Sequence, residues 1–320
     1  MLEVNVVRMN SVFKPKRLVV AVCIFLALGA KSLYAQGEVI RVETNLITVP
    51  AVVTDRQGRN QADLKVEDFE IFEDGKKQEI AYFSSSDQPI TVFLLMDVSD
   101  SVRAEITEIA RAATAFIGKL QGTDSIMAAQ FSWRTEMVIP KTKVADLKGR
   151  LTLRISEGDP ETLIYDAVKF AQRRMDGIQG KSAIIVLSDA MGSGLSASYK
   201  STIKDAQEQE PVFYTMHFGV SRERPFADPK KFAKYRDTSI SYMKTLAEMT
   251  GGRYYQFDSV NDIDGTFNEI LTDLRRQYQL GYYSDSPGKN GEKRKITVKV
   301  NRPDVAVRSR NEVVYKKGNK

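Results

Sequence analysis

The chain has 320 residues, of which 42% are hydrophobic and 28% are charged, as is typical of a globular protein with about two domains. The formal net charge of +6 falls to +2 without residues 1–35, which carry five basic residues and one acid. A nearly balanced charge with no interleaving of Arg and aromatic residues excludes nucleic acid as an expected partner.

The N-terminal segment has the pattern of a secretory signal. Basic residues at Lys14–Arg17 precede the apolar run Leu18–Ala30, and a small residue, Ala35, precedes a polar stretch. The run is shorter than the roughly twenty residues that span a bilayer. We expect a signal peptide at 1–35, export to the periplasm, the cell envelope or the medium, and no integral span after cleavage; an uncleaved anchor is the alternative. Cys23 lies inside the run, so the mature chain has no cysteine.

Residues 38–88 predict β-structure only. Val42–Val53 is rich in β-branched residues, and Gln78–Phe83 alternates apolar and polar residues. Asp74 and Gly75 form a dipeptide that favours a tight hairpin between two strands. These strands are too few for an independent domain, so they need partners elsewhere in the chain.

Residues 89–276 alternate strands with helices, which predicts a doubly wound, mainly parallel α/β sheet of Rossmann-like type. The expected strands are Val92–Met96, Ser125–Phe131, Trp133–Ile139, Ala183–Leu187, Val212–Phe218 and Arg253–Phe257. The expected helices are Glu105–Leu120, Thr162–Met175, Ala197–Gln207, Ser239–Met249 and Ile263–Leu274. The charged stretch Arg222–Asp237 is expected to be a surface insertion, either a solvated loop or a loop that selects a partner.

Residues 277–316 return to β-structure before a short tail at 317–320. The expected strands are Tyr278–Tyr283, Lys295–Val300, Val305–Arg310 and Val313–Tyr315. The most economical arrangement joins this segment to residues 38–88 in one small β-sandwich, with the α/β domain inserted between the two parts.

Polar residues follow the apolar strand Val92–Met96 at the point where ligands bind on α/β sheets. Asp97, Ser99 and Ser101 occupy alternate positions of one turn, so a carboxylate and two hydroxyls can converge there. Oxygen ligands favour a hard divalent cation, with Mg²⁺ expected first and Mn²⁺ or Ca²⁺ as alternatives.

This D-x-S-x-S pattern resembles the metal-ion-dependent adhesion site (MIDAS) of von Willebrand factor A (VWA) domains. Thr162, at the start of an expected helix, and Asp189, after the apolar run Ile184–Leu187, resemble the remaining residues of that site. Leu64–Phe69 and Glu73–Gly75 resemble the N-terminal region of exported bacterial VWA-related proteins.

The resemblance implies a role for each residue of the site. Ser99 and Ser101 would bind the metal directly, and Thr162 would bind it directly or through water. Asp97 and Asp189 would act through water or orient the hydroxyls. Two departures from the family pattern stand out: Pro160 and Glu161 replace two glycines, and Ala190–Gly194 lacks further acids. Glu161 could hydrogen-bond into its loop or compete as a metal ligand.

The expected function is an exported, non-enzymatic module that holds an exposed Asp or Glu of a protein partner at the metal. The alternative is a structural component of cell-envelope assembly, in which the β-sandwich makes the contacts and the metal is only structural. Catalysis by a Ser-His-Asp triad is not expected, because His217 lies inside the apolar run Val212–Phe218. The sequence has no phosphate-binding Gly-rich loop, and Gly192–Gly194 does not form a hydrolase nucleophile elbow.

Overall fold

The structure is a computed structural model that describes residues 46–85, 88–158, 161–190, 192–219, 229–286 and 288–315. Thr44–Lys320 forms one compact unit, distinct from Met1–Glu43. The signal peptide expected at 1–35 and the tail at 317–320 lie outside the described residues. The domain boundaries expected near residues 88 and 276 remain predictions.

A six-stranded sheet organises the α/β part, in the order β10-β9-β8-β5-β6-β7. Its strands are β5 (Thr91–Asp97), β6 (Ser125–Phe131), β7 (Thr135–Lys143), β8 (Ser182–Ser188), β9 (Val212–Phe218) and β10 (Tyr254–Phe257). All neighbours pair in parallel except β7, which is antiparallel to β6. Because β5 is a central strand of a sheet whose two faces are both covered by helices, it needs apolar residues on both of its faces, as the unbroken run predicted.

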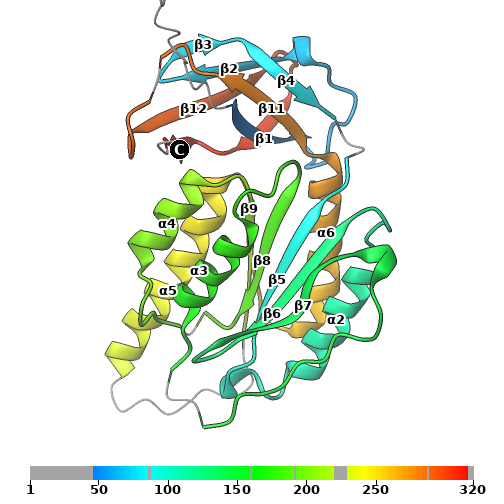
Figure 1. Cartoon of the computed structure of the whole chain (residues 1–320), viewed down its shortest axis with the longest axis vertical. Coiled ribbons are helices and arrows are strands. Elements are labelled where there is room, and N and C mark those ends of the chain that lie inside the picture. The colour runs from blue at the N-terminus through cyan, green and yellow to red at the C-terminus, as the bar shows by residue number, and fades with distance from the viewer. Residues whose placement is uncertain are drawn as a thin grey trace, which may run out of the picture. The chain divides into compact units, whose positions relative to one another are not determined.

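Helices cover both faces of this sheet (Figure 1). They are α2 (Ile106–Gly118), α3 (Ile164–Met175), α4 (Tyr199–Glu208), α5 (Pro229–Thr250) and α6 (Ile263–Arg276). Side chains alternate along β5: Phe93 and Leu95 pack in the core with α3, α4 and α5, whereas Leu94 and Met96 pack in the core with α2 and α6. The doubly wound α/β fold expected from the sequence is therefore correct.

Helix α5 begins earlier than expected. The sequence predicted a helix over Ser239–Met249 and an irregular surface insertion over Arg222–Asp237. Residues 220–228 lie outside the described part, but the chain is helical from Pro229 to Thr250. A proline suits the first helical turn, where its missing N–H is not needed. The prediction of a loop is therefore wrong for residues 229–237.

The terminal segments form two four-stranded sheets, with orders β13-β1-β11-β4 and β14-β12-β2-β3. The N-terminal strands are β1 (Leu46–Asp55), β2 (Phe69–Glu73), β3 (Lys76–Gln78) and β4 (Ile80–Ser84). The C-terminal strands are β11 (Tyr278–Tyr283), β12 (Lys293–Val300), β13 (Val305–Ser309) and β14 (Glu312–Val314). Both sheets contain strands from both ends and share one hydrophobic core, as the economical arrangement predicted.

The hairpin expected at Asp74 and Gly75 is also present. Glu73 pairs with Lys76 across a two-residue turn, and both turn residues have positive φ, 47° for Asp74 and 83° for Gly75. Such turns match the twist of the two strands that they connect.

The β-sandwich contacts the α/β part at the amino-terminal edge of the parallel sheet. Arg310 donates to the carbonyl of Gln209, just before β9, at 2.6 Å. Gln207 at the end of α4 donates to Glu312 at 2.6 Å, and Arg308 pairs with Asp273 of α6. Because parallel strands share one direction, their carboxyl ends lie at the opposite edge, away from these contacts (Figure 1).

Candidate functional site

Asp97 ends β5 at the carboxyl edge of the sheet and is completely buried. The Ser99 N–H donates to its Oδ1 at 2.9 Å, and the Ser188 hydroxyl donates to its Oδ2 at 2.7 Å. Burial raises the pKa of Asp97, and these hydrogen bonds oppose the rise. A buried carboxylate with two donors is thus held at a fixed position between β5 and β8.

Ser99 and Ser101 follow in the turn that leads to a short 3₁₀ helix, Asp100–Val102. Their hydroxyl oxygens lie 2.9 Å apart, and Ser99 is 4% exposed. The carboxylate of Asp100 instead contacts Arg103, which donates to its Oδ1 through Nε at 3.0 Å and through Nη2 at 2.8 Å. The turn therefore presents two hydroxyls together and directs the intervening carboxylate to a guanidinium.

Thr162 lies in a loop between the ends of β6 and β8. The Leu163 N–H donates to the carbonyl of Ser132 at 2.7 Å, and the Ser193 N–H donates to the carbonyl of Thr162 at 2.8 Å. The loop after β8 approaches the Thr162 loop so closely that residue 192 has to be glycine, because a Cβ at Gly192 would lie 2.6 Å from Cγ2 of Ile164. Backbone contacts on both sides thus fix the half-buried loop that carries Thr162.

Asp189 follows β8 and is 4% exposed. Ala190 has a φ of 56°, and its N–H donates to the Ser188 hydroxyl at 3.1 Å, so the chain turns sharply after Asp189. Since Asp97 and Ser188 end neighbouring strands, Asp189 lies at the same edge as Asp97. The structure therefore places all five predicted residues, Asp97, Ser99, Ser101, Thr162 and Asp189, around one rim.

Other acids near the rim have separate roles. Glu161 is exposed and accepts a hydrogen bond from the Ser193 hydroxyl at 3.2 Å, so it bonds to the loop after β8 rather than within the Thr162 loop. Asp166 accepts from the N–H groups of Leu195, Ser196 and Ala197. Asp159 and Pro160 lie outside the described residues. Within the described ranges, no group of three or more His, Cys, Asp or Glu residues is arranged to hold a metal.

Ser188 and Tyr235 at the rim were not anticipated from the sequence, whereas His217 was expected to be buried. Ser188 orients Asp97, and its place directly before Asp189 was the available signal. Tyr235 of α5 hydrogen-bonds Ser193, and burial raises its pKa. His217 is buried, as expected, and its Nδ1 lies 2.8 Å from the Tyr254 hydroxyl. Burial lowers the pKa of His217 to about 4, while a hydrogen bond with the Asp189 backbone acts in the opposite sense. Neither the contact of Tyr235 with Ser193 nor that of His217 with Tyr254 has a signature in the sequence.

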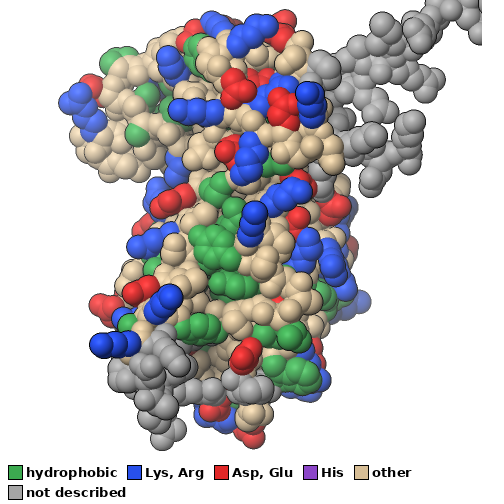
Figure 2. Space-filling view, turned by 90° about the vertical axis from the view of Figure 1, so that its left-hand side faces the viewer, with side chains coloured by type: hydrophobic (Ala, Val, Ile, Leu, Met, Phe, Trp, Pro, Cys, Tyr) green, Lys and Arg blue, Asp and Glu red, His purple; other side chains and the backbone are tan. Residues whose placement is uncertain are grey.

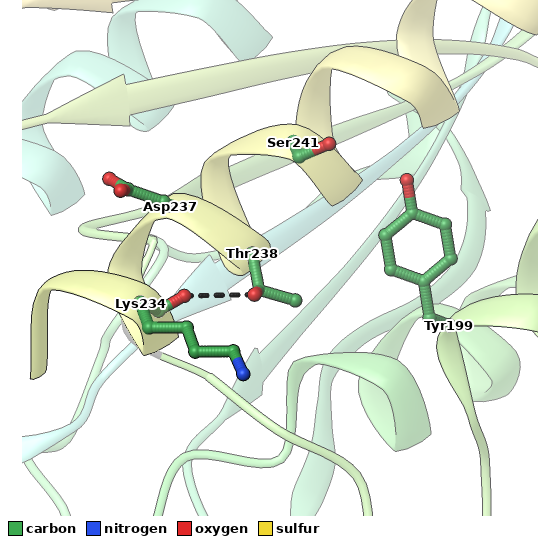
Figure 3. Close-up of a pocket in the computed structure, with 5 residues that line it drawn as sticks. All are labelled: Tyr199, Lys234, Asp237, Thr238 and Ser241. Atoms are coloured by element: carbon green, nitrogen blue, oxygen red, sulfur yellow. Dashed lines mark hydrogen bonds between the residues drawn. The ribbon is translucent and has the colours of Figure 1, made fainter. Parts of the chain in front are cut away.

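A separate hollow of about 470 Å³ lies beside α5, lined by Tyr199, Lys234, Asp237, Thr238 and Ser241. Figure 3 shows that Lys234 and Asp237 point in different directions and that Tyr199 stands across from them. The one hydrogen bond drawn, from the Thr238 hydroxyl to the Lys234 carbonyl at 2.8 Å, is internal to the helix. These side chains do not converge on a common point, so the hollow is a weaker candidate than the rim.

The face beside α4 and α5 carries mixed charge. Figure 2 shows Lys and Arg interspersed with Asp and Glu, with hydrophobic side chains gathered along the middle. A large positive patch, which would attract a polyanion, is not visible on this face. Among the described residues, no helix has the length and apolar character needed to cross a bilayer.

Comparisons with known proteins address the family. Residues 92–192 match the family model for the von Willebrand factor type A domain. A comparison with curated proteins finds no match. Among solved structures, the ArnB paralog VWA2 from Sulfolobus acidocaldarius is 14% identical with a TM-score of 0.45, over 84% of this chain and 75% of that one. A von Willebrand factor type A protein from Catenulispora acidiphila is 11% identical with a TM-score of 0.47, over 80% and 76%.

A third solved structure is the vWF domain of the type V pili tip protein Mfa5 from Porphyromonas gingivalis. It is 11% identical, with a TM-score of 0.41, over 59% of this chain and 95% of that one. At such identities and TM-scores, these similarities carry no information about a ligand or a partner. The family assignment comes from the sequence match, which spans β5, its D-x-S-x-S turn, the Thr162 loop and Asp189. Residues 92–192 of the chain belong to the von Willebrand factor type A domain family.

Proposed function

We propose that the chain is an exported binding protein that holds a divalent cation at this rim and uses it to capture an acidic side chain of a protein partner. Ser99 and Ser101 bind the cation directly, and Thr162 binds it directly or through water. Asp97 and Asp189 balance its charge and orient the hydroxyls. The observation that carries the proposal is the pair of serine hydroxyls beside a completely buried carboxylate.

The spacing of the hydroxyls supports Mg²⁺ or Mn²⁺. Oxygen ligands lie about 2.0–2.1 Å from Mg²⁺ in octahedral geometry, so two adjacent ligands are about 2.9 Å apart. A tetrahedral zinc site would separate them by about 3.3 Å, whereas neighbouring equatorial ligands of a seven-coordinate Ca²⁺ are about 2.8 Å apart, so the spacing argues against zinc and leaves Ca²⁺ as the alternative. The Ser99 and Ser101 oxygens are 2.9 Å apart. They hydrogen-bond at this distance and could accept a magnesium ion without moving apart.

The donor set explains why an acid would bind. Three of the five residues offer neutral hydroxyls, and only Asp97 and Asp189 bring charge. The bound cation supplies a strong positive charge with a ligand position to fill, and an anionic side chain is its best complement. The buried hydrogen bonds to Asp97 hold that carboxylate in place, so it needs little rearrangement when the cation binds.

Export and the absence of catalysis complete the proposal. Residues 1–35 have the signal pattern described above, which supports a periplasmic, envelope or secreted location. The side chain best suited to proton transfer at neutral pH, His217, is buried and has a lowered pKa, so it is a poor general base. A protein-binding or adhesive role uses the rim without a chemical step.

A displayed library of random peptides tests this function. Peptides selected on the immobilised chain with Mg²⁺ should require an Asp or Glu and should be released by chelator. Ser99→Ala should lose them, whereas Ser241→Ala, an exposed serine of α5, should retain them. Selected peptides that bind equally with chelator, or without any acid, would contradict the proposal.

One observation favours the alternative of a structural assembly component. Leu46 and Tyr283 are 37% and 48% exposed and are direct cross-strand partners on β1 and β11 of the β-sandwich. Two adjacent apolar side chains on a sheet can form an assembly contact. If this surface is the functional one, replacing Leu46 and Tyr283 with serine should abolish association with the native partner, and Ser99→Ala should leave it unchanged.

A further inference from the structure

Two large hydrophobic side chains of the α/β part are exposed near the rim, among the residues that the structure describes. In the part of the chain that the structure describes, four such residues are exposed: Leu46 (37%), Trp133 (46%), Leu195 (84%) and Tyr283 (48%). Leu46 and Tyr283 belong to the β-sandwich. Trp133 and Leu195 are the two in the α/β part, and both follow strands that end at the rim, β6 and β8.

Backbone contacts place these two residues on opposite sides of the Thr162 loop. Ser132, which precedes Trp133, accepts from the N–H of Leu163 at 2.7 Å. Ser193, two residues before Leu195, donates to the carbonyl of Thr162 at 2.8 Å. Backbones joined in this way lie about 4.8 Å apart, so the two outer segments are about 10 Å apart. Trp133 and Leu195 therefore flank the residue that completes the metal site.

The loop that carries Leu195 is held firmly. The carboxylate of Asp166 accepts from the N–H groups of Leu195, Ser196 and Ala197 at 2.7, 3.0 and 3.1 Å. A Cβ at Gly194 would lie 2.2 Å from the carbonyl oxygen of Ala197, so the turn is tightly closed. A rigid loop loses little conformational freedom on binding, which makes its exposed Leu195 an effective contact.

We infer that Trp133 and Leu195 are apolar anchors on either side of the metal. The partner would be a protein segment that places one acidic side chain between two apolar ones. This inference rests on the metal-dependent function proposed above and specifies its ligand. A separation of about 10 Å matches roughly three residues of extended chain. Because the acid lies between the two apolar residues, each of them is expected within about two positions of the acid.

Glu161 adds a restriction on the partner. It is exposed in the Thr162 loop, between the two anchors, and the Ser193 hydroxyl fixes its carboxylate at 3.2 Å. A second acid beside the metal-bound one would meet this like charge, which disfavours binding. The preferred segment thus carries one acid rather than a run of acids.

Trp133 provides a direct readout, because it is the single tryptophan of the chain. The probe is the Mg²⁺-dependent peptide with the highest affinity from the library described above, synthesised without tryptophan. Its binding to the full chain should shift Trp133 emission to shorter wavelength and protect it from acrylamide quenching. Chelator should reverse both changes.

Substitutions distinguish the contribution of the anchors to peptide binding from that of the metal. Leu195→Ser should weaken the peptide about tenfold, which corresponds to losing part of the burial of one leucine, without changing the affinity for Mg²⁺. Trp133→Ser, followed by calorimetry, should have a similar effect. Leu46→Ser and Tyr283→Ser are the controls, because these two exposed apolar residues lie in the β-sandwich, and both variants should bind the peptide as the unmodified chain does.

Two results would overturn the inference while the proposed function stands. One is unchanged peptide affinity in both Leu195→Ser and Trp133→Ser, with Mg²⁺ still required. The other is a set of selected peptides in which the acid is flanked only by polar residues. Failure of the proposed function is distinguishable, because the peptides would then bind without Mg²⁺ or without an acid.

Discussion

Replacing Gly192 with alanine should damage the site through packing alone. A Cβ at this position would lie 2.6 Å from Cγ2 and 2.8 Å from Cβ of Ile164, and 3.3 Å from the carbonyl oxygen of Thr162. Ile164 is completely buried in the core with α3 and α5, so it has no free space to enter. The new methyl group must therefore push apart the β8 loop and the Thr162 loop.

The size of the effect follows from the overlap. Ordinary carbon contacts are about 3.5–4.0 Å, so Ile164 or the loop has to move by roughly 1 Å. Overpacking of this kind costs about 1–3 kcal/mol of the free energy of unfolding. In a chain of this size, the melting temperature should fall by about 2–5 °C. Since Thr162 moves with the loop, the affinity for Mg²⁺ should also fall.

Differential scanning calorimetry and a Mg²⁺ titration measure both consequences. Gly265→Ala is the matched control, because Gly265 lies inside α6 and a Cβ there meets nothing within 4 Å. Alanine is a better helix former than glycine by about 1 kcal/mol, so this variant should melt slightly higher and bind Mg²⁺ normally. If Gly192→Ala keeps both the melting temperature and the Mg²⁺ affinity of the unmodified chain, the close approach of the two loops does not position Thr162.

Three further predictions concern buried polar groups. Asp97→Asn removes a carboxyl group whose negative charge is disfavoured by burial, as its raised pKa indicates, so the melting temperature of the metal-free chain should rise. In the same thermal assay, this variant should no longer be stabilised by Mg²⁺. His217 has its pKa lowered from 6.5 to about 4, so the unfolded chain takes up its proton first and stability falls as pH drops from 6.5 towards 4. Urea unfolding with chelator present should show the unmodified chain losing about 2 kcal/mol more than His217→Gln between pH 7 and 4.5; equal losses would refute this assignment. Arg294→Met should lower the free energy of unfolding in urea by about 3–5 kcal/mol, because it leaves the buried Glu73 without the guanidinium whose Nη1 lies 3.1 Å from its Oε1. Arg56→Met, which breaks an exposed ion pair, should lower it by at most about 1 kcal/mol.

The sequence predicted the α/β architecture because its strongest signals are local. The run Val92–Met96 has apolar residues on both faces, and only a central strand requires them. The Asp74 and Gly75 turn required positive φ at both positions, and the dipeptide favours this conformation. The sequence could predict that the two terminal segments share one sandwich, because neither could stand alone, but it did not predict the pairing of β1 with β11 and β13.

The sequence did not predict features that depend on contacts between residues far apart in the chain. Residues 229–237 belong to α5, although their charges mask the helical pattern in the sequence. The α5 side chains that pack in the core, such as Tyr242, Met243 and Leu246, follow them along the helix. Ser188 and Tyr235 act at the rim through contacts with Asp97 and Ser193, which lie far away in the sequence. A hydroxyl at a strand end or on a helix has no pattern that reveals such a partner.

The central claim is that this rim binds a divalent cation through hydroxyls. Isothermal titration of the purified chain with MgCl₂ and MnCl₂ tests it directly, with Ser99→Ala as the test variant and Ser241→Ala as the matched control. The account predicts a single site in the unmodified chain and in Ser241→Ala, and no binding in Ser99→Ala with unchanged far-ultraviolet circular dichroism. Absence of binding heat and of a thermal shift in the unmodified chain, or full binding by Ser99→Ala, would contradict it.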